Sequence, residues 1–111
     1  MNYKQCDIVL IPFPYSDLSS FRQRPALIIS NSILNSTQDV ICCLVTRNSD
    51  YNCLLMPEDC FADGKLPFKS WIKPYRIFTV HKNIIKKKIC SVKGKFYDKL
   101  LIEIQKYISR D

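Results

Sequence analysis

One arginine of this chain stands directly before a proline, in the run Arg24-Pro25-Ala26-Leu27-Ile28-Ile29-Ser30-Asn31. Proline biases the residue before it toward an extended backbone, so we expect the Arg24 guanidinium to project in a defined direction from the start of a strand. A guanidinium is planar and permanently charged, and it can donate two parallel hydrogen bonds to a phosphate. Arg24 is therefore a candidate phosphate ligand, and the competing interpretation is a solvated loop arginine.

A hydroxyl that could act beside Arg24 ends the apolar run 40–45. Thr46 follows that run, and Arg47 comes next. A threonine at a strand end is commonly a β former or a cap, so its hydroxyl means little alone. If the strands that begin at Pro25 and end at Thr46 are antiparallel neighbours, Arg24 and Thr46 lie at the same end of the sheet. Both side chains could then bind one phosphate.

Other catalytic arrangements lack the residues they need. His81 is the only histidine, which excludes a mechanism with two histidines, and its place after an apolar run favours a structural or surface role. Gly64 and Gly94 are the only glycines, so there is no glycine-rich phosphate loop. The six cysteines form no CxxC motif and no Cys/His pair at metal spacing. We therefore expect neither a metal site nor a cofactor.

Chain length predicts the number of domains, and net charge indicates the kind of binding partner. A chain of 111 residues has the size of one domain, so we expect a single domain over residues 1–111, for which dimerisation would add stability. The net charge of +7 favours a polyanionic partner, RNA or DNA. Twelve of the seventeen basic residues are lysines, so a surface that only maintains solubility is the alternative.

The cysteines and the apolar runs indicate a compartment. Cys42, Cys43, Cys53 and Cys90 lie in apolar runs, where a reduced thiol behaves as a small hydrophobe, and this favours a reducing cytoplasm. No apolar run approaches the roughly 20 residues that cross a bilayer. We expect a cytoplasmic protein with no membrane partner.

Short apolar runs predict a mostly antiparallel sheet or barrel. The expected strands span residues 7–13, 25–30, 39–46, 52–56, 72–80 and 88–92, and most are continuously apolar, which predicts burial on both faces. Apolar residues at three- and four-residue steps predict an amphipathic helix over about residues 95–109, with its stripe against the barrel. The long loops span residues 15–23, 47–51 and 58–71, and Asp63-Gly64 in the last predicts a turn.

The order of these motifs resembles one family. The run Asp7-Ile8-Val9-Leu10-Ile11-Pro12-Phe13-Pro14-Tyr15-Ser16-Asp17-Leu18-Ser19, the Arg24-Pro25 run, the strand closing on Val45-Thr46, and Lys73-Pro74-Tyr75-Arg76-Ile77-Phe78-Thr79-Val80 are similar to PemK/MazF toxins of type II toxin-antitoxin systems. The resemblance implies a mainly β fold, an SH3-like β-barrel of the CcdB/PemK type with a C-terminal α-helix in a single compact domain. It also implies a homodimer that cleaves single-stranded RNA without a metal and is silenced by a cognate antitoxin.

The resemblance assigns roles to particular residues. Arg24 and Thr46 fall on the family's catalytic arginine and threonine, which line the scissile phosphate while the ribose 2′-hydroxyl attacks it. Arginine is a poor base, so charge stabilisation in the transition state is the expected role of Arg24. The further residues that we expect to bind RNA are the neighbouring hydroxyl and basic residues Ser19, Arg22, Arg47, Lys69 and Lys73. Phe21, Phe68 and Trp71 could stack on bases, although core burial is the stronger interpretation for Trp71.

The chain departs from the family pattern at three positions. Cys6 and Cys90 stand where glycine is frequent, and Arg47 follows Thr46 where a small hydroxyl residue is common. The two cysteines affect only the backbone conformation at their positions. Arg47 is next to the expected catalytic threonine, so the RNA sequence that the protein prefers is not determined by the resemblance. Two alternatives to an RNA-cleaving toxin are a catalytically silent relative that binds nucleic acid or protein, and an ordinary β-barrel adaptor.

Overall fold

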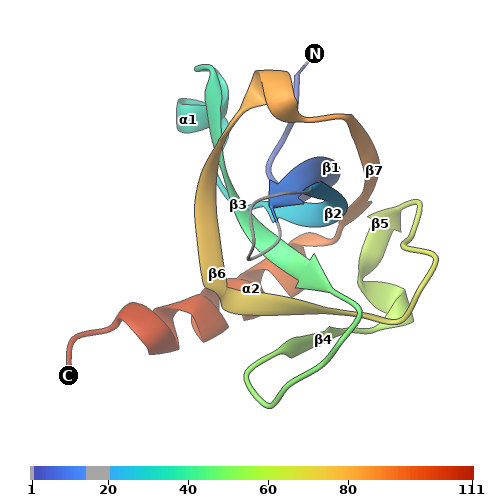
Figure 1. Ribbon diagram of the computed structural model, residues 1–111. Helices are drawn as coiled ribbons and strands as arrows, with labels where there is room; N and C mark the ends of the chain where they lie inside the picture. Colours follow the sequence, from blue (N-terminus) through green and yellow to red (C-terminus); the bar gives the residue numbers. More distant parts are fainter. Residues whose placement is uncertain (1, 15–20) are drawn as a thin grey trace.

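The computed structural model describes residues 2–14 and 21–111 as one curled sheet with a long C-terminal helix (Figure 1). In the described residues, seven strands form an antiparallel sheet in the order β4-β6-β3-β2-β1-β7-β5. The elements in chain order are β1 (Asp7–Pro14), β2 (Phe21–Ile28), α1 (Ser32–Asn35), β3 (Asp39–Thr46), β4 (Leu54–Met56), the 3₁₀ turn η1 (Glu58–Cys60), β5 (Phe61–Asp63), β6 (Ser70–His81), the 3₁₀ turn η2 (Lys82–Ile84), β7 (Lys87–Val92) and α2 (Gly94–Ile108).

The sheet wraps into a half-barrel, and α2 passes behind β6 and extends away from it toward the C-terminus at the lower left (Figure 1). The described strands β4 and β5 form the two edges, so the sheet does not close on itself. The mainly β fold with a C-terminal helix is therefore confirmed, as a curled antiparallel sheet.

Most expected elements are present, with different ends. The bounds of β3 are those expected from the sequence. β2 begins at Phe21 rather than Pro25, because it pairs with β1 from Pro14↔Phe21 to Ile8↔Leu27. Arg24 thus lies inside a strand instead of before it. The expected loop 58–71 also contains regular structure, since β5 pairs with β7.

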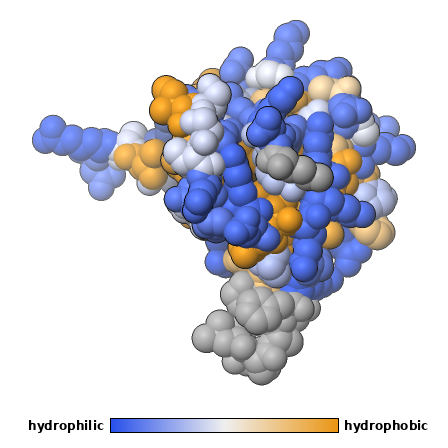
Figure 2. Space-filling view, turned by 90° about the horizontal axis from the view of Figure 1, so that it is seen from above, coloured by the Kyte–Doolittle hydropathy of each residue, from blue (hydrophilic) through white to orange (hydrophobic). Residues whose placement is uncertain are grey.

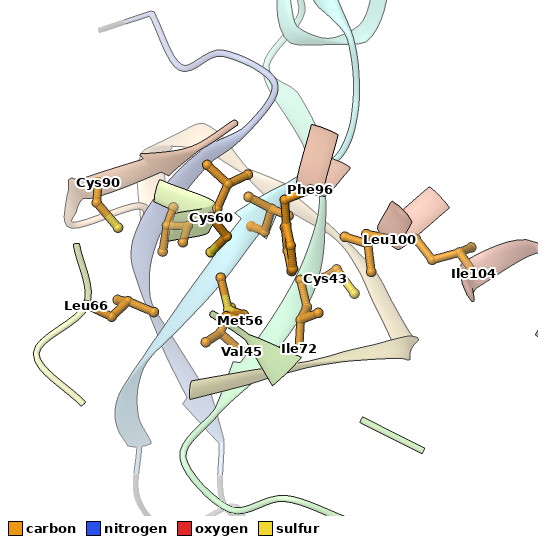
Figure 3. Packing of buried hydrophobic residues seen from close by; sticks show 13 residues of the cluster. Cys43, Val45, Met56, Cys60, Leu66, Ile72, Cys90, Phe96, Leu100 and Ile104 are labelled. Atoms are coloured by element: carbon orange, nitrogen blue, oxygen red, sulfur yellow. The ribbon is translucent and has the colours of Figure 1, made fainter. Parts of the chain in front are cut away.

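Two apolar cores cover opposite faces of the sheet. One lies between the sheet and α2 and includes Ile8, Leu27 and Leu100, each fully buried (Figure 3). The other covers the opposite face and includes Val9 and Ala26, also fully buried. Neighbouring residues of one strand therefore enter different cores, which explains why β1, β2 and β3 are continuously apolar. The predicted burial on both faces is confirmed.

The apolar stripe of α2 is only partly buried. Its first turns carry Phe96, Leu100 and Ile104 into the core. Ile108 is 73% exposed and Tyr107 45%, because the end of the helix extends past the sheet (Figure 1). The expectation that the whole stripe packs on the barrel is wrong for this end. Figure 2 shows a hydrophilic surface interrupted by separate apolar patches, with one elongated projection to the side.

Two backbone positions in the described part of the chain have positive φ. Gly64 has φ +70°, as the predicted turn requires, and a Cβ there would lie 3.2 Å from the Cβ of Cys90. Cys6 has φ +78°, a conformation that glycine adopts without strain. The Cys6 N–H donates to the Ile28 carbonyl (2.9 Å), and its carbonyl accepts from the Val92 N–H (3.0 Å). Hydrogen bonds on both sides hold the cysteine in this conformation.

Candidate functional site

A cavity of about 280 Å³ opens at the end of the sheet where β2 and β3 separate. Four consecutive residues of β2, the last two residues of β3 and the two that follow β3 line it. The opposite wall comes from the segment before β6. The lining residues are Leu10, Arg22, Gln23, Arg24, Pro25, Val45, Thr46, Arg47, Asn48, Leu66, Pro67, Phe68, Ser70 and Ile89.

Arg24 and Thr46 both line this cavity. The ladder between β2 and β3 ends at the pair Ala26↔Leu44, next to Pro25, which has no N–H to donate. Arg24 and Thr46 each lie two positions beyond this pair, on the two strands that separate there. The antiparallel arrangement expected from the sequence therefore holds, and it brings the two candidate residues to one end of the sheet.

The Thr46 hydroxyl is buried and held in place. Thr46 is only 4% exposed. Its Oγ1 accepts a hydrogen bond from the Asn48 backbone N–H at 3.1 Å. This side-chain turn keeps the hydroxyl oxygen at the point where β3 ends. Thr46 also pairs with Trp71 of β6, so its backbone belongs to the rigid part of the sheet. The hydroxyl itself donates to the Asn48 carbonyl at 3.4 Å, a long hydrogen bond that a ligand oxygen in the cavity can replace.

The electrostatic character of the cavity is basic. Arg22, Arg24 and Arg47 line it, and none of its described lining residues carries a carboxylate. The exposed Arg22 and Arg47 and the half-buried Arg24 present permanent positive charge, because guanidinium groups do not titrate in the physiological range. The cavity is suited to a ligand with one or more phosphate groups.

Arg47 stacks on an aromatic ring across the cavity. Its guanidinium carbon lies 4.4 Å from the centroid of the Phe68 ring, within the range of a cation–π contact. The segment that carries Phe68 is held by Ser70, whose buried Oγ donates to the Phe68 carbonyl at 2.8 Å. The cavity thus has a fixed apolar and cationic wall opposite Arg24.

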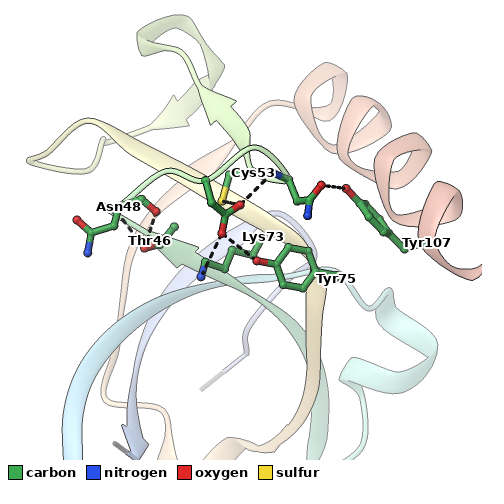
Figure 4. Close-up of polar contacts among 8 residues, drawn as sticks. Thr46, Asn48, Cys53, Lys73, Tyr75 and Tyr107 are labelled. Carbon is green, nitrogen blue, oxygen red and sulfur yellow. Dashed lines mark hydrogen bonds and ion pairs between the residues drawn. The ribbon is translucent and has the colours of Figure 1, made fainter. Parts of the chain in front are cut away.

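The loop after Thr46 is organised around one carboxylate. Asp50 accepts hydrogen bonds from the Asn52 backbone N–H (2.9 Å), the Cys53 thiol (3.3 Å) and the Tyr75 hydroxyl (3.2 Å), and its carboxylate lies 3.9 Å from the Lys73 ammonium (Figure 4). The Asn52 N–H contributes most to holding the pKa of Asp50 below its ordinary value, followed by the thiol, with smaller contributions from Tyr75 and Lys73.

This network extends to the C-terminal helix. The Tyr107 hydroxyl donates to Asn52 Oδ1 at 3.3 Å (Figure 4), and the Tyr107 ring packs edge-on against Tyr75 at 5.9 Å. The loop that follows Thr46 therefore rests on both β6 and α2.

Lys69 and Lys73, which were also expected to bind RNA, do not line the cavity. Lys69 stacks over Trp71 at 5.7 Å and lines a neighbouring hollow. Lys73 is directed to Asp50, as described above. Ser19, and the side chain of Phe21, lie outside the part of the chain that is described. Of the predicted site residues, the structure brings together Arg22, Arg24, Thr46 and Arg47.

His81 has a local structural role, as expected. Its Nδ1 accepts from the Asn83 backbone N–H at 3.1 Å and its Nε2 lies 2.9 Å from Gln38 Oε1. It caps η2 and lines a different hollow from Arg24.

The cysteines are free thiols with a packing role. Burial raises the pKa of Cys42 and Cys43 to about 12 and that of Cys60 and Cys90 to about 11. The burial predicted for Cys42, Cys43 and Cys90 is confirmed, whereas Cys53 is only partly buried and donates its thiol hydrogen to Asp50. In residues 2–14 and 21–111, no three His, Cys, Asp or Glu side chains gather as metal ligands would, and no helix has the length and apolarity to cross a membrane.

Sequence reasoning missed several lining residues. Asn48 and Ser70 act through backbone hydrogen bonds, which no local pattern reveals. Leu66 and Pro67 form apolar wall in a segment expected to be loop. Phe68 was expected to be a stacking platform, but its contact with Arg47 joins distant positions of the chain. In the sequence, only the position of Arg47 directly after Thr46 indicated that this side of the cavity takes part in the site.

Solved structures of other proteins share this fold. A MazE-MazF complex from Deinococcus radiodurans superposes with a TM-score of 0.79 at 13% identity over 100% of both chains. An endoribonuclease from Mycobacterial species has a TM-score of 0.74 at 17% identity, over 96% of this chain and 90% of that one. A Mycobacterial endoribonuclease in complex with its cognate antitoxin has a TM-score of 0.76 at 16% identity, over 99% and 96%. These identities show a common fold.

A family model matches almost the whole chain. It covers residues 4–108 and describes a PemK-like, MazF-like toxin of type II toxin-antitoxin systems. No curated protein matches the sequence. The matched region includes β1, the Arg24-Pro25 step, Thr46 and all of α2. This chain therefore belongs to the PemK-like, MazF-like toxins of type II toxin-antitoxin systems.

Proposed function

We propose that this chain is a metal-independent endoribonuclease that cleaves single-stranded RNA and thereby inhibits translation and growth. The observation that carries the proposal is the shared cavity of Arg24 and Thr46, lined by two further arginines. Phosphate-binding groups converge there from two strands, on a basic surface that attracts a polyanion. The family match supports the same conclusion.

The chemistry is an attack within the substrate. The ribose 2′-hydroxyl attacks the adjacent phosphorus, the bond to the 5′-oxygen of the next nucleotide breaks, and the products end in a 2′,3′-cyclic phosphate and a 5′-hydroxyl. Arg24 stabilises the negative charge that develops on the phosphoryl oxygens, and Thr46 donates a hydrogen bond to one of them or to the attacking hydroxyl. DNA lacks the internal nucleophile and is not cut.

The partners follow from the same surface and the same family. Single-stranded RNA is the substrate, and a cognate antitoxin that covers the basic cavity would block it. A homodimer is the proposed working form, and size-exclusion chromatography with light scattering measures it directly. The proposed compartment is the cytoplasm, where RNA is available and thiols stay reduced.

The decisive experiment is cleavage of single-stranded RNA in the presence of EDTA. Wild-type protein should release products with 5′-hydroxyl ends, and DNA of the same sequence should remain intact. Arg24→Ala should lose about 10²- to 10³-fold in rate, the range for removing one donor to a developing oxyanion. Arg24→Lys keeps the charge without the bidentate fork and should fall between the two. Undiminished cleavage by a folded Arg24→Ala protein would overturn the assigned role.

One observation favours a second candidate, a member of the same family that binds nucleic acid or a protein but does not cleave. The Thr46 hydroxyl, the proposed donor to the reacting phosphate, already donates to the Asn48 carbonyl at 3.4 Å. Tight RNA binding, or capture of one defined protein, without any cleavage would select this candidate.

A further inference from the structure

Arg47 and Phe68 are stacked on each other. The guanidinium carbon lies 4.4 Å from the ring centroid, and the Ser70 hydroxyl of β6 donates to the Phe68 carbonyl. Stacking restrains the plane of the guanidinium, so that its N–H groups point outward along a defined edge. A surface arginine without such a contact loses side-chain entropy when it binds a ligand. Stacking on Phe68 already restricts the Arg47 side chain, so this loss on binding is smaller.

The pair lies beside the proposed reacting centre. Arg47 directly follows Thr46, and Phe68 lines the same cavity as Arg24. A phosphate between Arg24 and Thr46 would therefore place one of its two flanking nucleotides against Arg47 and Phe68. This statement rests on the function proposed above.

The surroundings of the pair suit a base better than a second phosphate. The adjacent wall consists of Leu66 and Pro67. Leu66 is buried in the core, and the exposed Pro67 offers apolar surface to the face of a planar ring. Phe68 is 56% exposed, so the side chains around it leave much of the ring available for stacking. Single-stranded RNA is commonly recognised in this way, with splayed bases stacked on aromatic or guanidinium planes and read at their edges.

An arginine edge selects one base over the others. Its two parallel N–H donors match the O6 and N7 acceptors of guanine, whereas adenine presents a donor at the position of O6. We infer that Arg47, stacked on Phe68, reads a guanine next to the phosphate held by Arg24 and Thr46. The pair is thus a specificity determinant, separate from the groups that stabilise the reaction.

The binding test uses short uridine tracts in which fluorine replaces every 2′-hydroxyl, so that nothing can be cut. One tract carries a single guanine, a second carries adenine, and a third carries 7-deazaguanine, in which C–H replaces N7. Wild-type protein should bind the guanine tract roughly 5- to 150-fold more tightly than the adenine tract, the range for one bidentate contact. The 7-deazaguanine tract should lose much of this advantage.

Variants assign the preference to the pair. Arg47→Gln should abolish the difference between guanine and adenine, and Phe68→Leu should reduce it, while Phe68→Tyr keeps the ring and should retain it. Arg110→Gln makes the same charge change beyond the end of α2 and should leave the preference intact. Equal binding of all tracts by wild type would overturn the inference, as would an equal loss on every tract in Arg47→Gln, which would assign Arg47 to a phosphate.

Cleavage of a long mixed-sequence RNA separates this inference from the proposed function. Sequencing of the new 5′-hydroxyl ends should show guanine enriched at one position beside the cut for wild type and for Arg110→Gln, and not for Arg47→Gln. Cleavage without any guanine enrichment overturns the inference alone. A protein that prefers the guanine tract but cuts no RNA overturns the proposed function and leaves the base contact supported.

Discussion

Arg24 and Thr46 line one cavity, and each lies two positions beyond the last ladder pair of β2 and β3, Ala26↔Leu44. The pairing stops at Pro25, which has no N–H for the ladder. The proline thus does more than orient the arginine before it. It marks the place where two neighbouring strands part, and the opening that results is occupied by side chains suited to a phosphate.

Two substitutions at Thr46 distinguish a role of its hydroxyl in cleavage from a role of its shape in the fold. Thr46→Val keeps the branched shape but removes the hydroxyl, and we expect cleavage to fall about 10- to 100-fold, because one hydrogen bond to the reacting phosphate is lost. Thr46→Ser keeps the hydroxyl and should retain most activity. The measurement is the single-turnover rate on one RNA. Equal rates for the valine and serine variants would show that the hydroxyl takes no part.

Asp50 should make stability depend on pH in the acid range. Its pKa lies below the ordinary value of 3.8, chiefly because the Asn52 N–H donates to the carboxylate. A folded-state pKa that is depressed adds stability above pH 3.8, and this is lost as the pH falls through the folded pKa. Asp50→Asn should therefore have a lower Tm than wild type at neutral pH, with a difference that shrinks below 3.8.

Thermal unfolding followed by circular dichroism across this pH range provides the test. Tyr75→Phe removes only one of the contacts to Asp50 and should keep most of the pH dependence. A Tm difference between Asp50→Asn and wild type that stays constant down to the lowest pH would contradict the assignment.

The positive φ of Cys6 predicts that glycine at this position gives a more stable protein than alanine, the reverse of the usual order. Cys6→Ala and Cys6→Gly both remove the thiol, but alanine keeps the Cβ that is strained at φ +78°. We expect Cys6→Gly to be more stable than Cys6→Ala by about 1 kcal/mol, since left-handed conformation costs an L-residue roughly 1–2 kcal/mol. Chemical denaturation measures the difference. In an ordinary extended position alanine would be the more stable of the two.

Two adjacent leucines test the partial burial of α2. Leu100 is fully buried and Leu101 is 40% exposed. Leu100→Ala should cost about 2–5 kcal/mol, as truncations in a packed core do, and Leu101→Ala should cost less than about 1 kcal/mol. Urea unfolding with unchanged m-values would establish both figures. Similar losses for the two variants would mean that both faces of the helix are covered in solution.

The sequence predicted the features that neighbouring residues determine. The bounds of β3 follow from an unbroken apolar run that ends in Thr46, and the Asp63-Gly64 turn follows from a glycine that tolerates positive φ. Placing Arg24 and Thr46 at one sheet end needed only the antiparallel rule for consecutive strands. These inferences are local or depend on one pairing.

Contacts between distant segments could not be predicted. Arg47 meets Phe68, and Tyr107 meets Asn52, because the curl of the sheet brings separate loops together, and no periodic pattern encodes that curl. Helical periodicity likewise predicted an apolar stripe on α2 but not its coverage. Ile108 is exposed because the last turn of α2 extends past the end of the sheet, and helical periodicity does not show where the sheet ends.

Each edge of the described sheet is a strand of three residues, Leu54–Met56 at one side and Phe61–Asp63 at the other. These short edges offer few free backbone N–H and C=O groups for the lateral addition of a strand. β6, however, continues past β4 to His81, and its outer side over residues 73–81 pairs with no described strand. Main-chain donors and acceptors for a neighbouring molecule are therefore concentrated along this part of β6 rather than at the two terminal strands of the sheet.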